Sequence, residues 1–425
     1  MSRILIWRQV VSGSDIDIFS NTDYSQLDST LKKLYNGACP NWGNKLWFQG
    51  LYSEIDTPEN EVHTRTNETA DQINANYDLI IYPMANFFSV EYASDTAVHV
   101  EMFSHIKIPI YVIACGAQAE TYGDIEGLIH KIGTPSSRFI EAIYRTGGEF
   151  ALRGNFTKEF FDRLGFSSAV VTGCPSMYQL GAGFRVNVTK VSREEIKPII
   201  TGKLNYFEDI MKSIPESIYL DQETYAACLY RKGFLANSNL KSDILFSFNY
   251  SVYQAELLGQ GRIKMIVDMN DWYQYIRNHR FNFAFGTKIH GSIMPILAGV
   301  PAVLVAIDSR TMEMAEFFDI PYVKFDYRRP YSLDNFYAAY EEMDYEKFNQ
   351  HYEERFRFYE DFLIQHKIVK KINENNRFFA NKGKEEFDEF TPNRADFEKY
   401  AKKLKREEPL LKLGKKVIQI KNNKR

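Results

Sequence analysis

The chain has 425 residues, of which 44% are hydrophobic and 25% charged, and its formal net charge is −3. This composition is that of a globular protein, and the length favours two or three domains, each able to bury a core of its own. The small negative charge argues against a nucleic-acid-binding protein, which normally carries a basic domain.

Short apolar runs alternate with helical stretches in the first half of the chain, as in parallel sheets built from strand-helix-strand units. We expect strands at residues 4–6, 79–82, 110–114, 150–152 and 169–172. The helices expected between them cover residues 45–54, 91–106, 136–145 and 157–164. Residues 181–203 are weakly patterned and contain Pro198, so we place the change of domain there.

The second half repeats the alternation and then becomes helical. Strands are expected at residues 218–221, 244–248, 262–267, 281–285, 302–307 and 322–325, and residues 340–375 are expected to be mainly helical. We therefore predict an α/β protein with an N-terminal domain over 1–185 and a C-terminal domain over 186–340. A helical segment over 341–398 is expected to pack back on the domains, followed by a basic tail over 399–425.

The basic tail contains many lysines and arginines, and its only acids are Glu407 and Glu408. Such a tail is usually a solvated chain end. The alternative is a weak electrostatic hold on an anionic membrane surface, to which each Lys or Arg contributes about 1 kcal/mol. The second interpretation predicts peripheral contact with the inner face of the membrane.

Cysteine spacing and hydropathy indicate a cytoplasmic protein. The cysteines form no CxxC pair, so neither a zinc site nor a disulfide framework is expected; they are Cys39, Cys115, Cys174 and Cys228. The apolar stretch at the amino terminus is too short for a signal peptide and is broken by Arg8. No apolar run reaches the roughly 18–20 residues that a spanning helix needs.

Four motifs contain candidate site residues, and the first is Asn41-Trp42-Gly43-Asn44 before a predicted helix. Asn and Gly at this place suit a turn whose backbone N–H groups face an anion, with Asn41 and Asn44 as ligand contacts. The alternative is an ordinary N-cap, since Asn is a preferred capping residue. The spacing leaves both open.

The second motif, Ala114-Cys115-Gly116-Ala117-Gln118, follows a predicted strand. Glycine lets the backbone approach a ligand closely, and the Gln118 amide both donates and accepts hydrogen bonds. The alternative is a tight turn between strand and loop. Gln118 is the candidate contact here.

The third motif places Arg153 at a strand end, before a helix that Asn155 is expected to cap. Its guanidinium is able to form a bidentate contact with a carboxylate or a phosphate. A structural salt bridge to a neighbouring acid is the alternative. The segment from Val171 to Ser176, VTGCPS, completes this motif after one further helix and strand.

The fourth motif spans residues 281–318 and contains two charged turns, each between a strand and a helix. Lys288, His290, Gly291 and Ser292 follow one strand, and Asp308 and Arg310 follow the next. Ligands of parallel sheets bind outside the carboxyl ends of the strands, so both turns are expected to face one anion site. His290 changes charge near neutral pH, although a capping or packing role is the alternative.

These motifs resemble those of the polysaccharide pyruvyl transferase family. GTKIHG, followed by AGVPAVLVAIDSRTMEMAEFFDIP, is similar to the family's carboxyl-terminal signature, in which a G-x-R-x-H-G turn precedes a G-V-P strand and a D-S-R turn. RGNFTKEFFDRLG with VTGCPS resembles its central motif, and NWGNKLW resembles its first loop. The chain departs from the usual pattern by having Lys288 in place of arginine and Asn282 in place of aspartate.

The resemblance implies two facing Rossmann-like domains, similar to the GT-B glycosyltransferases, with the active site in the cleft between them. It also implies transfer of pyruvate from phosphoenolpyruvate to a sugar of a cell-surface polysaccharide, such as a capsule or exopolysaccharide, or to its precursor. The product is a pyruvate ketal, and phosphate is released. Phosphoenolpyruvate is then a co-substrate, and neither a cofactor nor a metal is expected.

Carried over to this chain, the family's basic-x-His pair falls on Lys288 and His290, and its central arginine on Arg153. We expect His290 to transfer protons, since its ordinary pKa suits both donation and acceptance. Lys288, Arg310, Arg153 and the helix start at Gly291 and Ser292 are expected to bind the anion. Asp308 orients a cation or the acceptor hydroxyl, or it only caps its turn.

Two other functions fit the predicted fold. The first is a nucleotide-sugar glycosyltransferase of the GT-B type, because fold alone does not determine function. The second is a non-catalytic sugar-phosphate binding protein or scaffold of a polysaccharide assembly complex. The acceptor of a pyruvyl transferase is a glycan or a lipid-linked sugar, and the basic tail favours a lipid-linked one.

Overall fold

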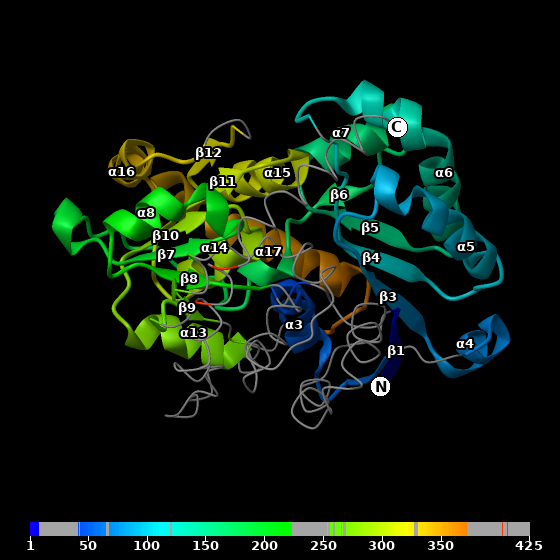
Figure 1. Cartoon of the computed structure of the whole chain (residues 1–425). Helices are drawn as coiled ribbons and strands as arrows, with labels where there is room; N and C mark the ends of the chain where they lie inside the picture. Colours follow the sequence, from blue (N-terminus) through cyan, green and yellow to red (C-terminus); the bar gives the residue numbers. More distant parts are fainter. Residues whose placement is uncertain are drawn as a thin grey trace. The chain divides into compact units, whose positions relative to one another are not determined.

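The computed structural model describes residues 1–7, 41, 43–64, 68–119, 121–222, 253, 256–257, 260–264, 266, 269–326, 330–371, 402 and 406. Within these residues the strands form two parallel six-stranded sheets, with helices between successive strands (Figure 1). The predicted α/β class with parallel sheets is confirmed, and so is the helical segment that follows the last strand.

The first sheet has the strand order β2-β1-β3-β4-β5-β6. Every residue of β3 and β4 is buried, as expected for central strands of a sheet covered on both faces. Strand β2 is not predicted from the sequence, because NEVHT is polar and lies at the sheet edge. The strands are β1 (Ser2–Ile6), β2 (Asn60–Thr64), β3 (Leu79–Pro83), β4 (Ile110–Cys115), β5 (Glu149–Leu152) and β6 (Val170–Val171).

Helices α5 and α6 lie side by side and cover one face of the first sheet (Figure 1). They bury Phe103 and Phe139 in one cluster with Ile80, Val112 and Phe150 of the strands. The apolar runs of the strands and the apolar stripes of the helices therefore share a core. The helices of this half are α3 (Asn44–Ile55), α4 (Ala70–Asn76), α5 (Ala93–Phe103), α6 (Ile125–Arg145) and α7 (Asn155–Arg163), with a 3-10 turn η2 (Val90–Tyr92).

Helix α6 begins well before residue 136, where the sequence predicts its start. Pro135 lies inside the helix, and a proline there normally indicates a helix boundary. The true start is capped by Asp124, whose Oδ1 accepts a hydrogen bond of 2.9 Å from the Gly127 N–H. The cap and the packed apolar face outweigh the proline, because tertiary packing overrides local propensity.

The second sheet has the strand order β12-β11-β10-β7-β8-β9. Strand β7 is a correction to the sequence prediction, which treats residues 181–203 as weakly patterned. All four residues of β7 are buried, and Pro198 stands at its first position, where a strand tolerates proline. The strands are β7 (Pro198–Thr201), β8 (Ile218–Leu220), β9 (Ile263–Lys264), β10 (Phe283–Gly286), β11 (Ala302–Ala306) and β12 (Tyr322–Lys324).

The second sheet reverses its strand order between β7 and β10. The chain runs outward from β7 through β8 and β9, and then returns to the other side of β7 as β10. Ligands of open parallel sheets bind outside the carboxyl ends of the strands at such a reversal. The strand predicted at residues 244–248 lies outside the described residues.

The carboxyl-terminal helix α17 packs on elements of the first half of the chain. The Tyr352 hydroxyl donates to the Met177 carbonyl at 3.0 Å, and the rings of His366 and Tyr111 are 4.9 Å apart. The remaining helices are α8 (Glu208–Ser213), α13 (Met269–Asn278), α14 (Ile289–Leu297), α15 (Ser309–Phe318), α16 (Leu333–Glu342) and α17 (Glu346–Gln365). Three 3-10 turns accompany them, namely η3 (Pro175–Met177), η4 (Arg193–Glu195) and η5 (Leu204–Tyr206).

The chain divides into two compact units. The first comprises residues 1–11, 43–216 and 268–385, and the second comprises residues 12–42, 217–267 and 386–425. Every contact of the candidate site described below lies within the first unit. The domain boundaries predicted from the sequence stay predictions.

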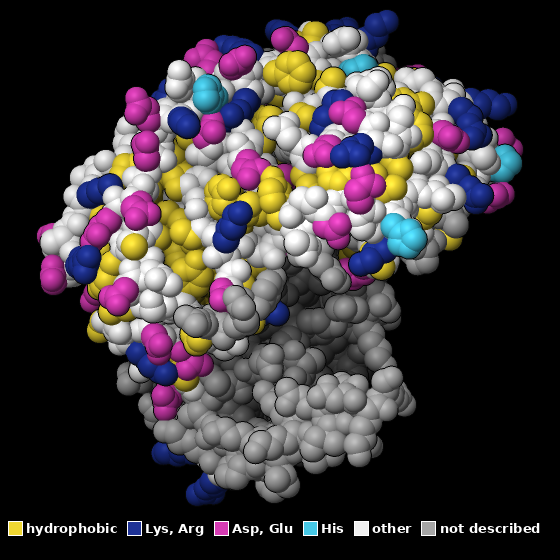
Figure 2. Space-filling view, turned by 90° about the horizontal axis from the view of Figure 1, so that it is seen from above, with side chains coloured by type: hydrophobic (Ala, Val, Ile, Leu, Met, Phe, Trp, Pro, Cys, Tyr) yellow, Lys and Arg dark blue, Asp and Glu magenta, His cyan; other side chains and the backbone are white. Residues whose placement is uncertain are grey.

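The described surface carries charges of both signs. In the face shown in Figure 2, Lys and Arg side chains are interspersed with Asp and Glu, and hydrophobic side chains lie between them. None of the helices in the described ranges has the length and apolar character that a bilayer crossing requires. The predicted basic tail lies outside the described residues except for Lys402 and Arg406, which are exposed.

Candidate active site

The turn after β10 places two predicted residues where the second sheet reverses its strand order. Gly286 ends β10, and a Cβ atom there would lie 2.0 Å from the Thr201 carbonyl oxygen of β7, so only glycine fits. Lys288 is the N-cap of α14 in an extended conformation. His290 lies in the first turn of α14 and is 5% exposed. The predicted cation and histidine therefore stand together at the reversal.

Gly291 and Ser292 continue the first turn of α14 in different ways. The Ser292 N–H donates to the Lys288 carbonyl oxygen at 3.0 Å, and its hydroxyl donates to the same oxygen at 3.4 Å. Both Ser292 donors therefore serve the helix. Gly291 is one position earlier, among the N–H groups that a helix start leaves without an intrahelical acceptor.

Arg153 is buried at the end of β5, with 2% of its surface exposed. Its backbone N–H donates to the Cys115 carbonyl oxygen of β4 at 2.8 Å. Its side-chain Nε and Nη2 are buried and have no hydrogen-bond partner among the described residues. A buried guanidinium with unpaired donors is costly, so this arrangement suits a site that an anion completes.

A bulge in β4 shapes the turn beside Arg153. The pairing of β4 with β5 shifts register between Ile113 and Cys115, and Ala114 between them has a φ of 62°. A left-handed conformation is unfavourable for a residue with a side chain, and bulges often lie next to functional sites. The bulge redirects the backbone so that the Cys115 carbonyl receives the Arg153 N–H.

The turn after β11 contains Asp308 and Arg310, and Asp308 contacts both its own helix and the arginine. Its Oδ1 accepts from the Thr311 N–H at 2.9 Å, which caps α15. Its Oδ2 accepts from Arg310 Nη2 at 3.0 Å. Arg310 Nε is buried and has no hydrogen-bond partner within the part of the chain that the structure describes. Asp308 thus caps the turn and also orients the cation.

Gln118 joins the turn after β4 to the turn after β11. Its Oε1 accepts from Asn86 Nδ2 at 2.6 Å, and its Nε2 donates to Asp308 Oδ2 at 3.5 Å. Beside it, the Ala119 N–H donates to Ser309 Oγ at 2.9 Å. The carboxyl ends of both sheets are therefore in direct contact at these turns.

Burial and two guanidinium groups determine the charge of His290. Burial lowers the pKa of its imidazole well below the ordinary value, and the positive charges of Arg153 and Arg310 lower the pKa further. His290 is consequently neutral at neutral pH. Because both guanidinium groups affect the pKa of His290, Arg153 and Arg310 each lie close enough to interact with it electrostatically.

Glu313 on α15 belongs to this cluster and is not predicted from the sequence. It is 1% exposed, and its carboxyl oxygens accept from the Thr157 N–H at 3.0 Å and from the Thr157 hydroxyl at 2.9 Å. Burial raises the pKa of Glu313 to about 8, and Asp308 adds to this rise, while Thr157 and Arg153 oppose it. Glu313 is therefore an uncharged carboxylic acid at neutral pH.

One signal in the sequence points to Glu313. The acid stands between Met312 and Met314 in a stretch of α15 that is entirely buried from Thr311 to Ala315. An ionisable residue in a buried apolar stretch needs a partner or a function. The partner, Thr157, cannot be identified from the sequence because it lies 156 positions away.

The asparagines of the first motif do not cap α3. Gly43 is the N-cap, in a helical conformation with no side-chain cap hydrogen bond, and Asn44 is the first helical residue. Asn41 belongs to the second compact unit. The roles predicted for Asn41 and Asn44 as ligand contacts stay predictions.

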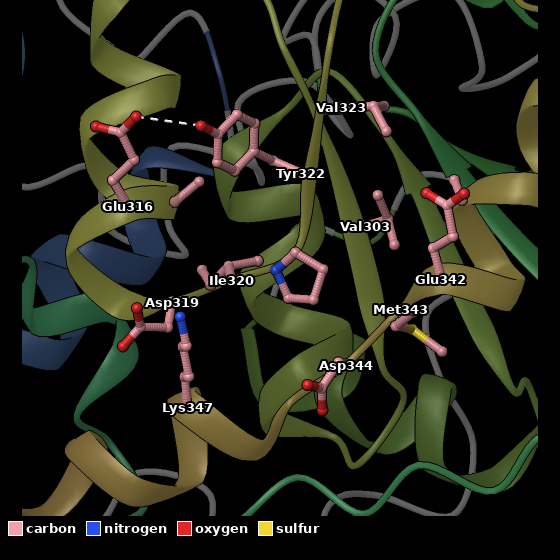
Figure 3. Close-up of a pocket in the computed structure, with 13 residues that line it drawn as sticks. Val303, Glu316, Asp319, Ile320, Tyr322, Val323, Glu342, Met343, Asp344 and Lys347 are labelled. Carbon is pink, nitrogen blue, oxygen red and sulfur yellow. Dashed lines mark hydrogen bonds between the residues drawn. The ribbon is translucent and has the colours of Figure 1, made fainter.

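A cavity of about 450 Å³ lies near the amino-terminal ends of β11 and β12, at the other end of these strands from the cluster. Figure 3 shows Asp319 and Lys347 on one side of it and Glu342 on the other. Within the described residues, no group of three or more His, Cys, Asp or Glu side chains is arranged to hold a metal ion. None of the predicted site residues lines this cavity.

The comparison with protein families identifies the family to which the chain belongs. Residues 8–309 match the family described as polysaccharide pyruvyl transferase. The chain belongs to the polysaccharide pyruvyl transferase family. The matched range includes Gln118, Arg153, Lys288 and His290, and it ends before Arg310 and Glu313. The resemblance seen in the sequence motifs is thus confirmed.

Two solved structures resemble the chain weakly. The S. aureus MnaA-UDP co-structure covers 88% of this chain and 99% of its own, with 11% identity and a TM-score of 0.35. A crystal structure of UDP-N-acetylglucosamine 2-epimerase covers 88% and 98%, with 11% identity and a TM-score of 0.36. At these TM-scores neither structure supports an inference about the site. No curated protein matches the chain.

One departure from the usual family pattern has a structural consequence here. Asn282 Oδ1 accepts from the Lys197 N–H at 2.8 Å, and its Nδ2 donates to the Glu195 carbonyl oxygen at 2.9 Å. An aspartate could not make the second bond, because an ionised carboxylate only accepts. Asn282 therefore links the start of β10 to the segment that leads into β7.

Proposed function

We propose that this chain transfers pyruvate from phosphoenolpyruvate to a sugar of a cell-surface polysaccharide or of its precursor. The product is a cyclic pyruvate ketal, and phosphate is released. Membership of the family supports a transferase of this kind. The observation that carries the proposal is the buried Arg153 guanidinium, whose Nε and Nη2 have no partner among the described residues and which lies near His290 and Arg310.

Phosphoenolpyruvate supplies the negative charge that would balance the cations near His290. Its phosphate and carboxylate together carry two to three negative charges, and separate cations are needed to hold the two groups apart. We assign Arg153, Arg310 and Lys288 to this task, with the start of α14 at Gly291 as a further donor. The ligand then lies outside the carboxyl ends of β5, β10 and β11, as expected for parallel sheets.

His290 is suited to proton transfer once the anion is bound. In the free protein its imidazole is neutral, because it is buried and faces two cations. A bound phosphate and carboxylate offset those cations, so the proton affinity of His290 rises when it is needed. His290 is only 5% exposed, and its low exposure to solvent strengthens each of these charge interactions.

The reaction balances with His290 as the single proton carrier. His290, protonated once the anion is bound, donates its proton to the methylene carbon of phosphoenolpyruvate, which leaves positive charge at C2. A sugar hydroxyl attacks C2, and His290 accepts the hydroxyl proton. The C2–O bond to phosphate then breaks, a second hydroxyl closes the ketal, and the remaining proton leaves with phosphate. We assign Asp308 to the orientation of Arg310 and Gln118 to the support of Asp308.

The acceptor sugar is assigned to the cleft side formed by the first domain, residues 1–185. Asn41 and Asn44 remain proposed ligand contacts, and Ser292 remains a proposed contact of the anion at the start of α14. A lipid-linked acceptor would bring the protein to the inner face of the membrane, with the basic tail over residues 399–425 as the contact. Removal of the tail then weakens binding to anionic vesicles without loss of activity on a soluble acceptor.

Phosphate release from phosphoenolpyruvate across a panel of acceptor glycans tests the proposal, followed by mass measurement of the product. We expect release only when an acceptor is present, together with the mass of an added pyruvyl ketal. Turnover of UDP-sugars without phosphoenolpyruvate would instead identify a glycosyltransferase. Binding of phosphoenolpyruvate with no phosphate release for any acceptor would identify a non-catalytic binding protein.

A further inference from the structure

Helix α7 begins immediately after Arg153 and has no cap of its own. Its N-cap is Gly154, which is extended and has no side chain to accept a hydrogen bond. The first N–H groups of a helix need acceptors from elsewhere. The acceptor here is Glu313 Oε2 of α15, which receives the Thr157 N–H at 3.0 Å. A residue of α15 therefore caps the helix that follows Arg153.

Two glycines leave the space in which Glu313 and Arg153 meet. A Cβ atom at Gly154 would lie 3.0 Å from Glu313 Cβ and 3.1 Å from its Oε2. A Cβ atom at Gly116 would lie 3.2 Å from Arg153 Cδ and 3.3 Å from Glu313 Oε1. The Arg153 stem and the Glu313 carboxyl group therefore flank the same point of the turn after β4.

Thr157 connects Glu313 to that turn. Its hydroxyl accepts from the Ala117 N–H at 2.8 Å and donates to Glu313 Oε1 at 2.9 Å. All three groups are buried. The turns after β4 and β5 and the helix after β11 are thus held at one point by hydrogen bonds.

We propose that Glu313 is a positioning residue that caps α7, holds the Arg153 turn in place and leaves the Arg153 charge available for the phosphoenolpyruvate anion. This inference rests on the proposed function and adds a residue to it. Glu313 acts through Arg153 and Thr157 and not on the substrate itself.

The protonation of Glu313 supports this role. An uncharged carboxyl group accepts the Thr157 N–H without neutralising Arg153, whereas an ionised one competes with the substrate for the guanidinium. Burial raises the pKa of Glu313 to about 8. Charged and titratable groups near it come from four elements, namely Arg153 after β5, Cys115 of β4, Tyr122 before α6 and Asp308 at the start of α15.

The role predicts a pH dependence of substrate binding. Because bound phosphoenolpyruvate favours the uncharged form of Glu313, its affinity should fall as the pH rises through about 8. Glu313→Gln preserves the shape and an acceptor for Thr157 but cannot ionise. In this variant KM for phosphoenolpyruvate should stay flat where that of the wild type rises. Glu313→Ala loses the cap, and its KM should rise about tenfold with a smaller change in kcat.

We would measure KM and kcat by phosphate release between about pH 6.5 and pH 9.5, which spans the titration. Glu316→Gln is the matched control, because it is the same change on the same helix at an exposed position. The inference is overturned if Glu313→Gln keeps the wild-type rise of KM with pH. If Glu313→Ala fails to fold, the profile of Glu313→Gln decides by itself.

Calorimetric binding of inorganic phosphate over the same pH range separates this inference from the proposed function. A wild-type protein that releases no phosphate from phosphoenolpyruvate contradicts the proposed function. In that case the role of Glu313 can still be tested. The affinity for phosphate should fall as the pH rises through about 8 in the wild type and should not fall in Glu313→Gln. Identical phosphate binding curves for the two proteins would reject the role of Glu313.

Discussion

Charged side chains near the carboxyl ends of the strands of the second sheet are paired differently from those near the amino ends. Near those carboxyl ends, Arg153 of the first sheet is buried with two side-chain nitrogens that have no partner among the described residues, and His290 and Glu313 are buried and uncharged at neutral pH. Near the amino ends lies the cavity of about 450 Å³, and two of the acids that line it have charged or hydrogen-bonding partners. Asp319 is paired with His351 and Arg355 at 2.7 Å each. Figure 3 shows the hydrogen bond of 3.1 Å that Glu316 accepts from the Tyr322 hydroxyl.

From this difference we infer that unpaired buried charge is a better guide to the proposed site than open volume. Asp319 and Glu316 beside the cavity need no ligand, because their ion pairs and hydrogen bonds are already made. A buried cation without an acceptor does need one, since its desolvation is otherwise uncompensated. We therefore expect chemistry near the carboxyl ends and none at the cavity, and four measurements test the contrast.

The largest effect is expected for Arg153→Met. Loss of two or more charge-assisted hydrogen bonds at about 1.5–3 kcal/mol each should lower kcat/KM for phosphoenolpyruvate about a thousandfold. The melting temperature should stay the same or rise, because the variant removes a buried charge that has no ion-pair partner in the described residues. Arg163→Met, at an exposed position at the end of α7, the helix that follows Arg153, is the control. Normal turnover by Arg153→Met would exclude the cluster around Arg153 as the anion site.

His290→Ala should lower kcat about a hundredfold, since general acid-base catalysis contributes about 10²–10⁴-fold. KM for phosphoenolpyruvate should change little, because His290 is neutral in the free protein. Steady-state phosphate release measures both, with exposed His130→Ala as the control. A variant that keeps near-normal kcat would remove His290 from the mechanism.

Glu313→Gln should change how stability depends on pH. The folded-state pKa of Glu313 is raised from 4.5 to about 8, so the unfolded state releases this proton first as the pH rises. Relative to the variant, the wild type should lose up to about 1.4 kcal/mol of unfolding free energy per pH unit between these values. Urea unfolding of both proteins at several pH values measures the difference. A constant difference would mean that Glu313 is already ionised in the folded protein.

The smallest effect is expected at the cavity. The double variant Glu342→Gln with Lys347→Met should keep phosphate release within about twofold of the wild type, as for surface changes away from a site. Both residues line the cavity, and neither belongs to the cluster around Arg153. A loss comparable with that of Arg153→Met would place the reaction at the cavity and reverse the comparison.

The strands were predictable where apolar runs are uninterrupted. The prediction was wrong where a proline interrupts the pattern. Strands β3, β4, β10 and β11 are continuous apolar runs, and each was expected close to its observed position. Strand β7 begins with Pro198, and α6 contains Pro135, so the local pattern indicated an irregular region or a boundary. Packing in the core decides both elements, and a short window of sequence does not contain that packing.

The sequence by itself determined which side chains stand after the strands. Because the carboxyl ends of parallel strands lie on one side of a sheet, His290 and Arg310 could be assigned to one site from their positions in the chain, and the family resemblance added Arg153. The tertiary structure decided their charges and added Glu313. Desolvation and Coulomb interactions depend on neighbours in space, and the partner of Glu313 lies 156 residues away. Protonation states are therefore properties of the folded cluster and not of the motifs.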